Sequence, residues 1–327
     1  MTKHALKKDL PENVSFNKNA ISANDDRKEI LQGLQKKQKV INPKYFYDTH
    51  GSELFERITQ QPEYYPTRTE RNILAHNASE IAQHCGDQCV LIEPGSGSSE
   101  KVRLLLDTVQ PATYVPMDIA ESFLQLSADK LGKEYPWLNI QAICADFHYF
   151  DDRSIELHHG RRVAFYPGST LGNMSPDVAL TFLKDIRRMV RVDGGLLIGI
   201  DLQKDNDRLH SAYNDKGGIT EEFNLNVLRH VNRVVNGNFD VTNFSHDAFY
   251  NEEMNRIEMH LVSNSDHIVT LADTAISFSR GESIHTENSY KYSLSSSKQL
   301  VENAGFRLRS AWVDEDRLFS VQYFDAV

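Results

Sequence analysis

Short apolar runs alternate with helical periodicity through the middle of the chain. The segments between the runs repeat their apolar positions every three or four residues, as Phe182, Ile186 and Met189 do. Ser175 and Pro176 supply the start signals of a helix. The pattern predicts strands over 88–94, 113–118, 139–147, 161–169 and 194–201, and helices over 98–109, 120–135 and 175–190. Strands alternating with helices are typical of parallel βαβ units covered on both faces, so we expect an α/β fold with a doubly wound sheet.

The pattern changes between residues 204 and 290, where the chain is first polar and helical and then strand-like. The expected elements there are a helical segment over 205–235 and strands over 256–263, 268–271 and 274–279. The strand and helix alternation then resumes. The expected elements after the change are a helix over 295–305 and strands over 307–313 and 317–324.

We interpret 204–290 as an insertion into the α/β fold. It is expected to pack with the N-terminal piece, because neither piece has an obvious core of its own. The predicted division is one discontinuous domain of 21–67 plus 204–290 and another of 68–203 plus 291–327. The polar residues 1–20 are expected to form a flexible N-terminus.

Composition narrows the possible functions. The chain has 327 residues, 40% of them hydrophobic, which suffices for one large domain or two smaller ones. A net charge of −10 argues against a polynucleotide ligand, since affinity for phosphates depends on an excess of Lys and Arg. No apolar run has the length of a signal-peptide core or a membrane span, so we expect a cytoplasmic protein. Cys85, Cys89 and Cys144 fit neither a disulfide set nor a metal pattern, and we expect buried, reduced thiols.

A glycine-rich turn, LIEPGSGSSEK, includes the end of the first predicted strand. A phosphate-binding P-loop requires G-x-x-x-x-G-K-[ST], whereas here Lys101 follows Glu100 and precedes Val102. A dinucleotide fingerprint requires a third glycine where this chain has Glu100, a carboxylate that would face the pyrophosphate. S-adenosylmethionine (SAM) carries no phosphate and presents both an ammonium and a carboxylate. A turn with Glu93 just before its glycines therefore suits SAM better.

Acidic residues also end the next two predicted strands. Asp118 ends the second, where a carboxylate can accept both ribose hydroxyls of SAM. Asp146 ends the third and precedes Phe147, so the two offer an acceptor for the adenine amine and a ring for stacking. Ligands of open α/β sheets bind beyond the carboxyl ends of the strands. An NAD site would also have a carboxylate that binds the ribose, but it would not account for the other residues of this set. The set favours a class I SAM-dependent methyltransferase, a Rossmann-like fold, with an additional α+β domain.

The loop after the fourth strand reads FYPGSTLGNMSP. Enzymes that methylate nucleobase amines typically have an Asn/Asp-Pro-Pro-aromatic motif at this place. The loop therefore argues against a nucleobase acceptor, in agreement with the negative charge.

Longer motifs make the chain similar to a known family. They are YFYDTHGSELFERITQQPEYYPTRTE, EPGSGSSEK, FYPGSTLGNMSP, DLQKDNDRLHSAYNDKGGITEEFNLNVL, RIEM and GESIHTENSYKY. From about residue 42 to its C-terminus, the chain resembles the L-histidine Nα-methyltransferases of ergothioneine biosynthesis, a histidine-specific SAM-dependent family. It departs from the family in a shorter segment between Met259 and Glu287, and in EPGSG where an ELGSG-like sequence is common.

The resemblance implies a role for each predicted domain. The domain of 68–203 plus 291–327 would bind SAM, the methyl donor, and the domain of 21–67 plus 204–290 would bind the substrate. The implied SAM contacts are Tyr64, Gly95, Lys101, Asp118, Asp146 and Phe147. No metal is implied.

The same resemblance implies how free L-histidine is bound. Asn173 and Tyr213 would contact its carboxylate, and Glu287 and Ser289 its imidazole ring. Tyr47 would act as the catalytic residue that orients the amine, although an ordinary pKa near ~10 argues against a general base. The remaining implied contacts are Phe55 and Met259 as apolar walls, and Gly168 and Thr170 in the fourth-strand loop.

These residues suit methyl transfer to the α-amine of histidine, because in-line displacement mainly requires alignment and exclusion of water. Holding the substrate by its carboxylate and ring is compatible with three successive transfers, which give the betaine hercynine. The alternatives are methylation of another aromatic amino acid, such as tryptophan or tyrosine, and a SAM-binding module without catalysis. Glu287 with Ser289 favours imidazole over indole or phenol. We expect a monomer with a small-molecule substrate and no nucleic-acid or membrane partner.

Overall fold

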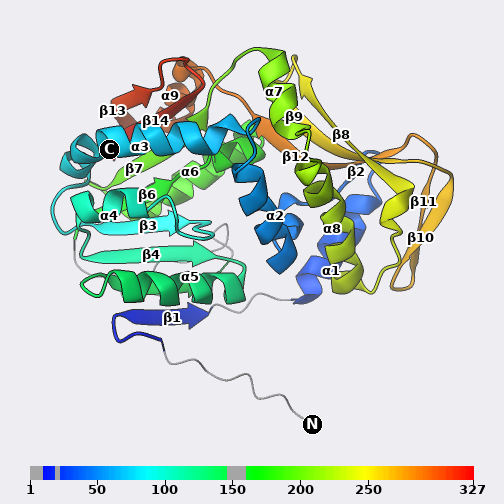
Figure 1. The fold of residues 1–327 in the computed structure, drawn as a ribbon, viewed down its shortest axis with the longest axis horizontal. Coiled ribbons are helices and arrows are strands. Elements are labelled where there is room, and N and C mark those ends of the chain that lie inside the picture. Colours follow the sequence, from blue (N-terminus) through cyan, green and yellow to red (C-terminus); the bar gives the residue numbers. More distant parts are fainter. Residues whose placement is uncertain (1–9, 19–22, 146–159) are drawn as a thin grey trace, which may run out of the picture.

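The computed structural model describes residues 10–18, 23–145 and 160–327. An eight-stranded sheet forms one half of the molecule (Figure 1), with the strand order β1-β5-β4-β3-β6-β7-β14-β13. Neighbouring strands are parallel except at β14, which is antiparallel to both β7 and β13. The bounds are β1 Val14–Lys18, β3 Val90–Pro94, β4 Thr113–Asp118, β5 Asn139–Cys144, β6 Arg162–Tyr166, β7 Gly195–Asp201, β13 Phe306–Val313 and β14 Phe319–Ala326. The five strands expected over 88–201 are all present.

Helices cover both faces of this sheet, as the amphipathic pattern requires. One hydrophobic core joins the sheet to α3 Tyr65–Cys85, α4 Arg103–Val109 and α5 Glu121–Glu134. A second core joins the opposite face to α6 Pro176–Val190 and α9 Leu294–Glu302. The helix expected to begin at residue 98 begins only at Arg103, because Ser99 has a left-handed φ of +55° that a helix does not accommodate.

A second, four-stranded sheet of order β2-β12-β9-β8 forms the other half of the molecule (Figure 1). Its strands are β2 Lys39–Val40, β8 Phe244–Asn251, β9 Arg256–Ser263 and β12 Ser283–Tyr290, and a separate hairpin consists of β10 His267–Leu271 and β11 Thr274–Phe278. The helices of this half are α1 Ala23–Leu34, α2 Thr49–Thr59, α7 Asn206–Tyr213 and α8 Ile219–Val235. Apolar side chains of these helices and of the second sheet make up a third core.

The helical segment expected over 205–235 is two helices, α7 and α8. Gly218 between them has a φ of +66°, a conformation that glycine adopts without strain. The Asp215 carboxylate accepts hydrogen bonds from the backbone N–H groups of Ile219 (3.0 Å) and Thr220 (2.8 Å). Asp215 thus pairs with the first free N–H groups of α8, where a new helix begins after the N-cap residue Gly218.

The N-terminal piece and the insertion share the third core. β2 pairs in parallel with β12, and the rings of Phe46 and Phe223 stack with centroids 4.5 Å apart. A short 3-10 helix, η1 Pro43–Phe46, leads from β2 towards α2. The two pieces expected to lack cores of their own therefore lie against each other.

The expectation that residues 1–20 are flexible is wrong for Val14–Lys18, which forms the edge strand β1 beside β5. The side chain of Asn13 donates to the backbone carbonyls of Gly132 (3.2 Å) and Leu138 (2.8 Å). Val14 is buried against Gly132, where a Cβ would stand 2.4 Å from its side chain. These partners are distant in sequence, so the local polarity of the segment did not reveal them.

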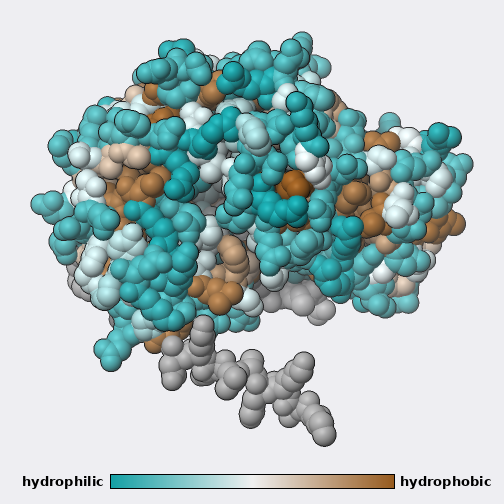
Figure 2. Space-filling model, in the orientation of Figure 1, coloured by the Kyte–Doolittle hydropathy of each residue, from teal (hydrophilic) through white to brown (hydrophobic). Residues whose placement is uncertain are grey.

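Hydrophilic residues cover most of the face in Figure 2, and apolar residues gather only in small patches. Within the described ranges, no helix has the length and apolar character needed to cross a membrane.

Candidate active site

A cavity lies between the two halves of the molecule and is lined by residues of both. Its walls contain all nine residues expected to bind substrate: Tyr47, Phe55, Gly168, Thr170, Asn173, Tyr213, Met259, Glu287 and Ser289. Tyr64, expected to contact SAM, lies in the same walls. The lining residues that the sequence did not point to are Ile58, Pro66, Ser169, Asp201, Ala212, Thr220 and Phe223.

The loop after β6 forms one wall of the cavity. Gly168 has a φ of +84°, and a Cβ there would stand 3.1 Å from the Lys101 ammonium. Its backbone N–H donates to the Glu70 carboxylate (2.8 Å), which also receives a hydrogen bond from Lys101 (2.6 Å). The 3-10 helix η4 Thr170–Asn173 follows and brings Thr170 and Asn173 to the wall. Glu70 on α3 thus joins this loop to the glycine-rich turn.

Aromatic rings form another part of the cavity lining. Tyr47 stands edge-to-face with Phe55 and with Phe223, both at 5.8 Å between centroids. Phe55 also meets Tyr64 at 6.4 Å. Burial, reinforced by the negative charge of Glu287, holds the pKa of Tyr47 well above its ordinary value. The Tyr47 hydroxyl therefore keeps its proton.

Glu287 lies on β12 opposite Met259 on β9, and it is only 9% exposed. Among the described residues, no group donates a hydrogen bond to its carboxylate. Burial raises the pKa of Glu287 to about 7, although the positive charge of Lys291 opposes the shift. A buried carboxylate without a donor favours a ligand that supplies one.

The sequence pattern gave no indication of β12 because buried polar residues interrupt it, two of which, Glu287 and Ser289, line the cavity. Thr286, Glu287 and Ser289 are all buried, so the strand lacks the alternation of apolar and polar residues that marks a strand with one face in water. Buried polar residues in a strand are a signal of a functional pocket.

A buried ionic network stands at the end of β7. The Asp201 carboxylate accepts from Lys291 (2.7 Å), Lys204 (2.5 Å) and the Tyr65 hydroxyl (2.8 Å). Burial opposes ionisation, but the two lysines hold the pKa of Asp201 below its ordinary value. Burial lowers the pKa of Lys204 to about 8. Asp201 ends a strand just as Asp118 does, so the same signal could have identified it.

Two hydroxyl groups of the cavity wall belong to the same network. Tyr213 donates to Ser289 (2.8 Å), and Lys291 donates to Ser289 (2.6 Å) and to Tyr213 (3.1 Å). Burial raises the pKa of Tyr213 well above its ordinary value, so this hydroxyl remains a donor.

The glycine-rich turn folds against the end of β4, next to the place where the strand order reverses between β3 and β6. Gly95 and Gly97 have φ values of +70° and +52°. The Asp118 carboxylate accepts from the backbone N–H groups of Gly97 and Ala120, both at 2.9 Å, and burial raises its pKa. Each oxygen keeps a further lone pair, as two ribose hydroxyls would require.

Glu93, the acidic residue just before the glycines, is paired within the protein. The Glu93 carboxyl is buried beneath the turn, where the Tyr114 hydroxyl donates to it and burial raises its pKa to about 8. Asp146 and Phe147, expected to contact the adenine, lie outside the described residues.

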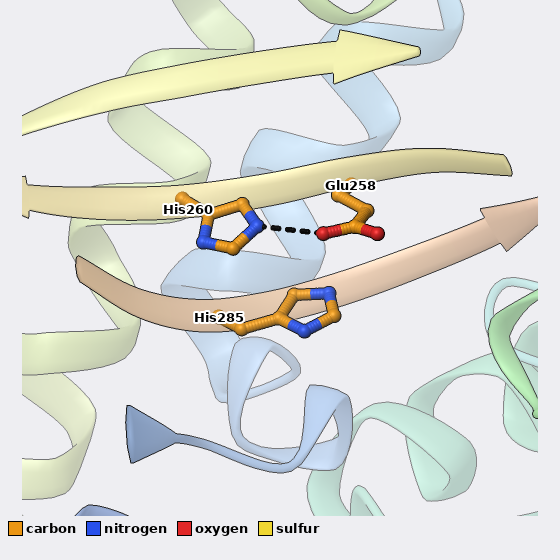
Figure 3. A group of neighbouring side chains, drawn as sticks. All are labelled: Glu258, His260 and His285. Atoms are coloured by element: carbon orange, nitrogen blue, oxygen red, sulfur yellow. Dashed lines mark hydrogen bonds and ion pairs between the residues drawn. The ribbon is translucent and has the colours of Figure 1, made fainter. Parts of the chain in front are cut away.

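A cluster of possible metal ligands occurs away from the cavity lining, in Glu258, His260 and His285. Figure 3 shows the two imidazole rings side by side, and their planes are 8° from parallel with centroids 4.6 Å apart. Glu258 accepts from His260 (3.0 Å) and from the Arg256 guanidinium (2.6 Å), while His285 pairs with the Glu287 backbone carbonyl (3.0 Å). A guanidinium against the carboxylate disfavours a cation there, so we interpret the cluster as hydrogen-bonded packing between β9 and β12.

Comparison with known proteins agrees with this geometry. The family described as "Histidine-specific methyltransferase, SAM-dependent" matches residues 26–326. The chain is 40% identical to a protein of Mycobacterium tuberculosis named histidine N-alpha-methyltransferase, covering 88% of this chain and 91% of that protein. It is 31% identical to ergothioneine biosynthesis protein 1 of Neurospora crassa, covering 81% of this chain and 31% of that protein.

Among solved structures, the fold is similar to that of a SAM-dependent methyltransferase from Clostridium acetobutylicum. The TM-score is 0.50 at 9% sequence identity, over 84% of this chain and 98% of that one. At this identity the likeness concerns the fold alone, which is the class I methyltransferase fold expected from the strand and helix pattern.

Proposed function

Since the chain belongs to the family of SAM-dependent, histidine-specific methyltransferases, we propose that it methylates the α-amino group of free L-histidine. Three successive transfers from SAM would give hercynine, a precursor in ergothioneine biosynthesis. The observation that carries the proposal is the cavity between the two halves, which collects donors, an unpaired carboxylate and aromatic rings. We infer further that the protein acts as a cytoplasmic monomer on this small molecule.

The cavity suggests how the substrate is held. Asn173 would donate to the histidine carboxylate and Tyr213 would contact it, while Glu287 would accept from the imidazole N–H and Ser289 would contact the other side of the ring. The segments 21–67 and 204–290 would thus form the substrate-binding domain. The segments 68–203 and 291–327 would bind SAM through the turn that contains Gly95 and the carboxylate of Asp118.

The chain's own residues can supply what methyl transfer requires. SAM, when bound, supplies an electrophilic methyl group on a sulfonium. Tyr47 would orient the amine lone pair, with its hydroxyl kept protonated by burial. Each transfer replaces an N–H with a methyl group, so amine hydrogen bonds alone cannot hold all intermediates. The rings of Phe55, Tyr64 and Phe223 offer π faces that favour a methylated ammonium.

A direct assay tests this function against its alternatives. The protein is incubated with excess SAM and a panel of amino acids, and the products are analysed by mass spectrometry. We expect mono-, di- and trimethylhistidine in sequence, with the trimethyl form accumulating. Preferred methylation of tryptophan or tyrosine would favour an Nα-methyltransferase for another aromatic amino acid. SAM binding without any product would favour a non-catalytic module.

Asp118→Ala is expected to weaken SAM binding by roughly 1.5–3 kcal/mol, because the ribose hydroxyls lose a charged acceptor. Calorimetric titration with SAM measures the change. Asp107→Ala serves as the control, since Asp107 is an exposed acid on the neighbouring helix α4. Equal SAM affinity in wild type and Asp118→Ala would remove Asp118 from the cofactor site.

Histidine turnover is expected to rise with pH in two steps. The lower step is the ionisation of Glu287, whose pKa of about 7 means that the accepting carboxylate is lost as pH falls. The upper step is deprotonation of the substrate amine, across roughly pH 7 to 9, since only the neutral amine attacks. The charged or titratable groups near Glu287 are Lys291, Tyr47, Tyr64 and Tyr213.

The measurement is kcat/KM for histidine against pH in wild type and Glu287→Gln. The variant cannot titrate at this position, so its lower step should disappear while the upper rise remains. A lower step of equal size in both proteins would assign it to the substrate ring and not to Glu287.

A further inference from the structure

Lys291 is a buried lysine that no step described above uses. It follows β12 directly, and only 2% of its surface is exposed. Its three N–H donors have three partners: Asp201 (2.7 Å), Ser289 (2.6 Å) and Tyr213 (3.1 Å). The ammonium thus links a strand end of the large sheet to two hydroxyl groups in the cavity wall.

An ammonium can only donate, so it fixes the direction of the hydrogen bonds around it. The oxygens of Ser289 and Tyr213 must both accept from Lys291. Each hydroxyl proton must then point away from the ammonium. Tyr213 directs its proton to Ser289, and no acceptor for the Ser289 proton occurs among residues 10–18, 23–145 and 160–327.

We propose that Lys291 is a positioning residue that sets Ser289 as a hydrogen-bond donor towards the substrate, so that the cavity selects a neutral imidazole. The inference rests on the proposed function. Two residues apart on β12, Glu287 presents an acceptor and Ser289 a donor. A neutral imidazole has one N–H and one nitrogen lone pair, which match this pair of groups. An indole has only the N–H, and an imidazolium has no lone pair to receive the Ser289 proton.

Asp201 is the counter-ion that stabilises the buried ammonium of Lys291. Desolvating a lysine with no exposed side-chain surface is costly without a counter-ion, and Asp201 lies 2.7 Å from Lys291 with 1% of its own side chain exposed. Lys204 shares the same carboxylate but donates to Asp201, the Tyr65 hydroxyl and the Leu202 carbonyl, and to neither cavity hydroxyl. Both lysines therefore pair with Asp201, but only Lys291 donates to the hydroxyl groups of Ser289 and Tyr213.

A double-mutant cycle between Lys291 and Ser289 tests the proposal. Lys291→Met is expected to lower kcat/KM for histidine by about tenfold to a hundredfold, mainly through KM. Ser289→Ala should lower kcat/KM for histidine about tenfold in the wild-type background but less than about threefold in the Lys291→Met background. Without the ammonium, the Ser289 hydroxyl proton is no longer held towards the substrate. Lys204→Met is the matched control, and Ser289→Ala should retain its full cost there.

SAM affinity and thermal melting establish that each variant is folded. If Lys291→Met does not fold, Lys291→Gln keeps an N–H donor and enters the same cycle. An equal cost of Ser289→Ala in all three backgrounds, in an enzyme that methylates histidine, would mean that Lys291 is only a structural counter-ion and would overturn the proposal. A wild type that does not methylate histidine would instead contradict the proposed function, and this inference with it.

Discussion

Asp201→Ala is expected to lower the free energy of unfolding by about 3–5 kcal/mol, the largest stability effect we foresee. The substitution leaves the ammonium groups of Lys291 and Lys204 buried without their shared counter-ion, and it removes the acceptor of the Tyr65 hydroxyl. Removing one partner of a buried ion pair costs more than the pair contributes, because the remaining charge stays desolvated.

Urea unfolding followed by circular dichroism measures this loss. Lys298→Ala is the control, because its pair with Glu302 is long at 4.0 Å and the side chains of Lys298 and Glu302 are 48% and 30% exposed. A pair of this kind contributes about 0–1 kcal/mol. A loss for Asp201→Ala no larger than that of the control would show that the two lysines find other partners at little cost.

Glu287→Ala is expected to lower kcat/KM for histidine by roughly tenfold to a hundredfold, and Glu287→Gln by less. The carboxylate is buried without a donor of its own, so a substrate N–H would form a charge-assisted hydrogen bond worth about 1.5–3 kcal/mol. Gln keeps an acceptor oxygen but not the charge, whereas Ala removes both. Discrimination against phenylalanine should shrink, because its ring has no N–H and no longer leaves a buried carboxylate unpaired.

The experiment compares kcat/KM for histidine, tryptophan and phenylalanine in wild type and both variants. SAM affinity is expected to stay unchanged, since Glu287 lies on the second sheet and not at a strand end of the large one. Glu282→Ala is a matched control, because Glu282 directly precedes β12 and pairs with Lys39, outside the cavity lining. Unaltered histidine kinetics in Glu287→Ala would mean that the imidazole is recognised elsewhere.

The sequence by itself determined the strands of the large sheet other than β1, and the kind of cofactor the sheet suits. β3, β6 and β7 are buried along their whole length, so their apolar runs identify them without any partner. The glycine-rich turn and Asp118 follow strands in sequence, and the ends of parallel strands meet at one edge. Such signals are local in the sequence. The residues of the cavity were identified only through the family resemblance, by matching individual positions.

The tertiary structure alone decided which distant groups meet. β1 pairs with β5 and β2 with β12 through backbone hydrogen bonds, which carry no signature in the side chains. The contact of Lys291 with Asp201, Tyr213 and Ser289 joins an edge of the large sheet to the second sheet. In the sequence, nothing marks these four polar residues as neighbours. Only their burial in one place, where every donor must find an acceptor, makes them a unit.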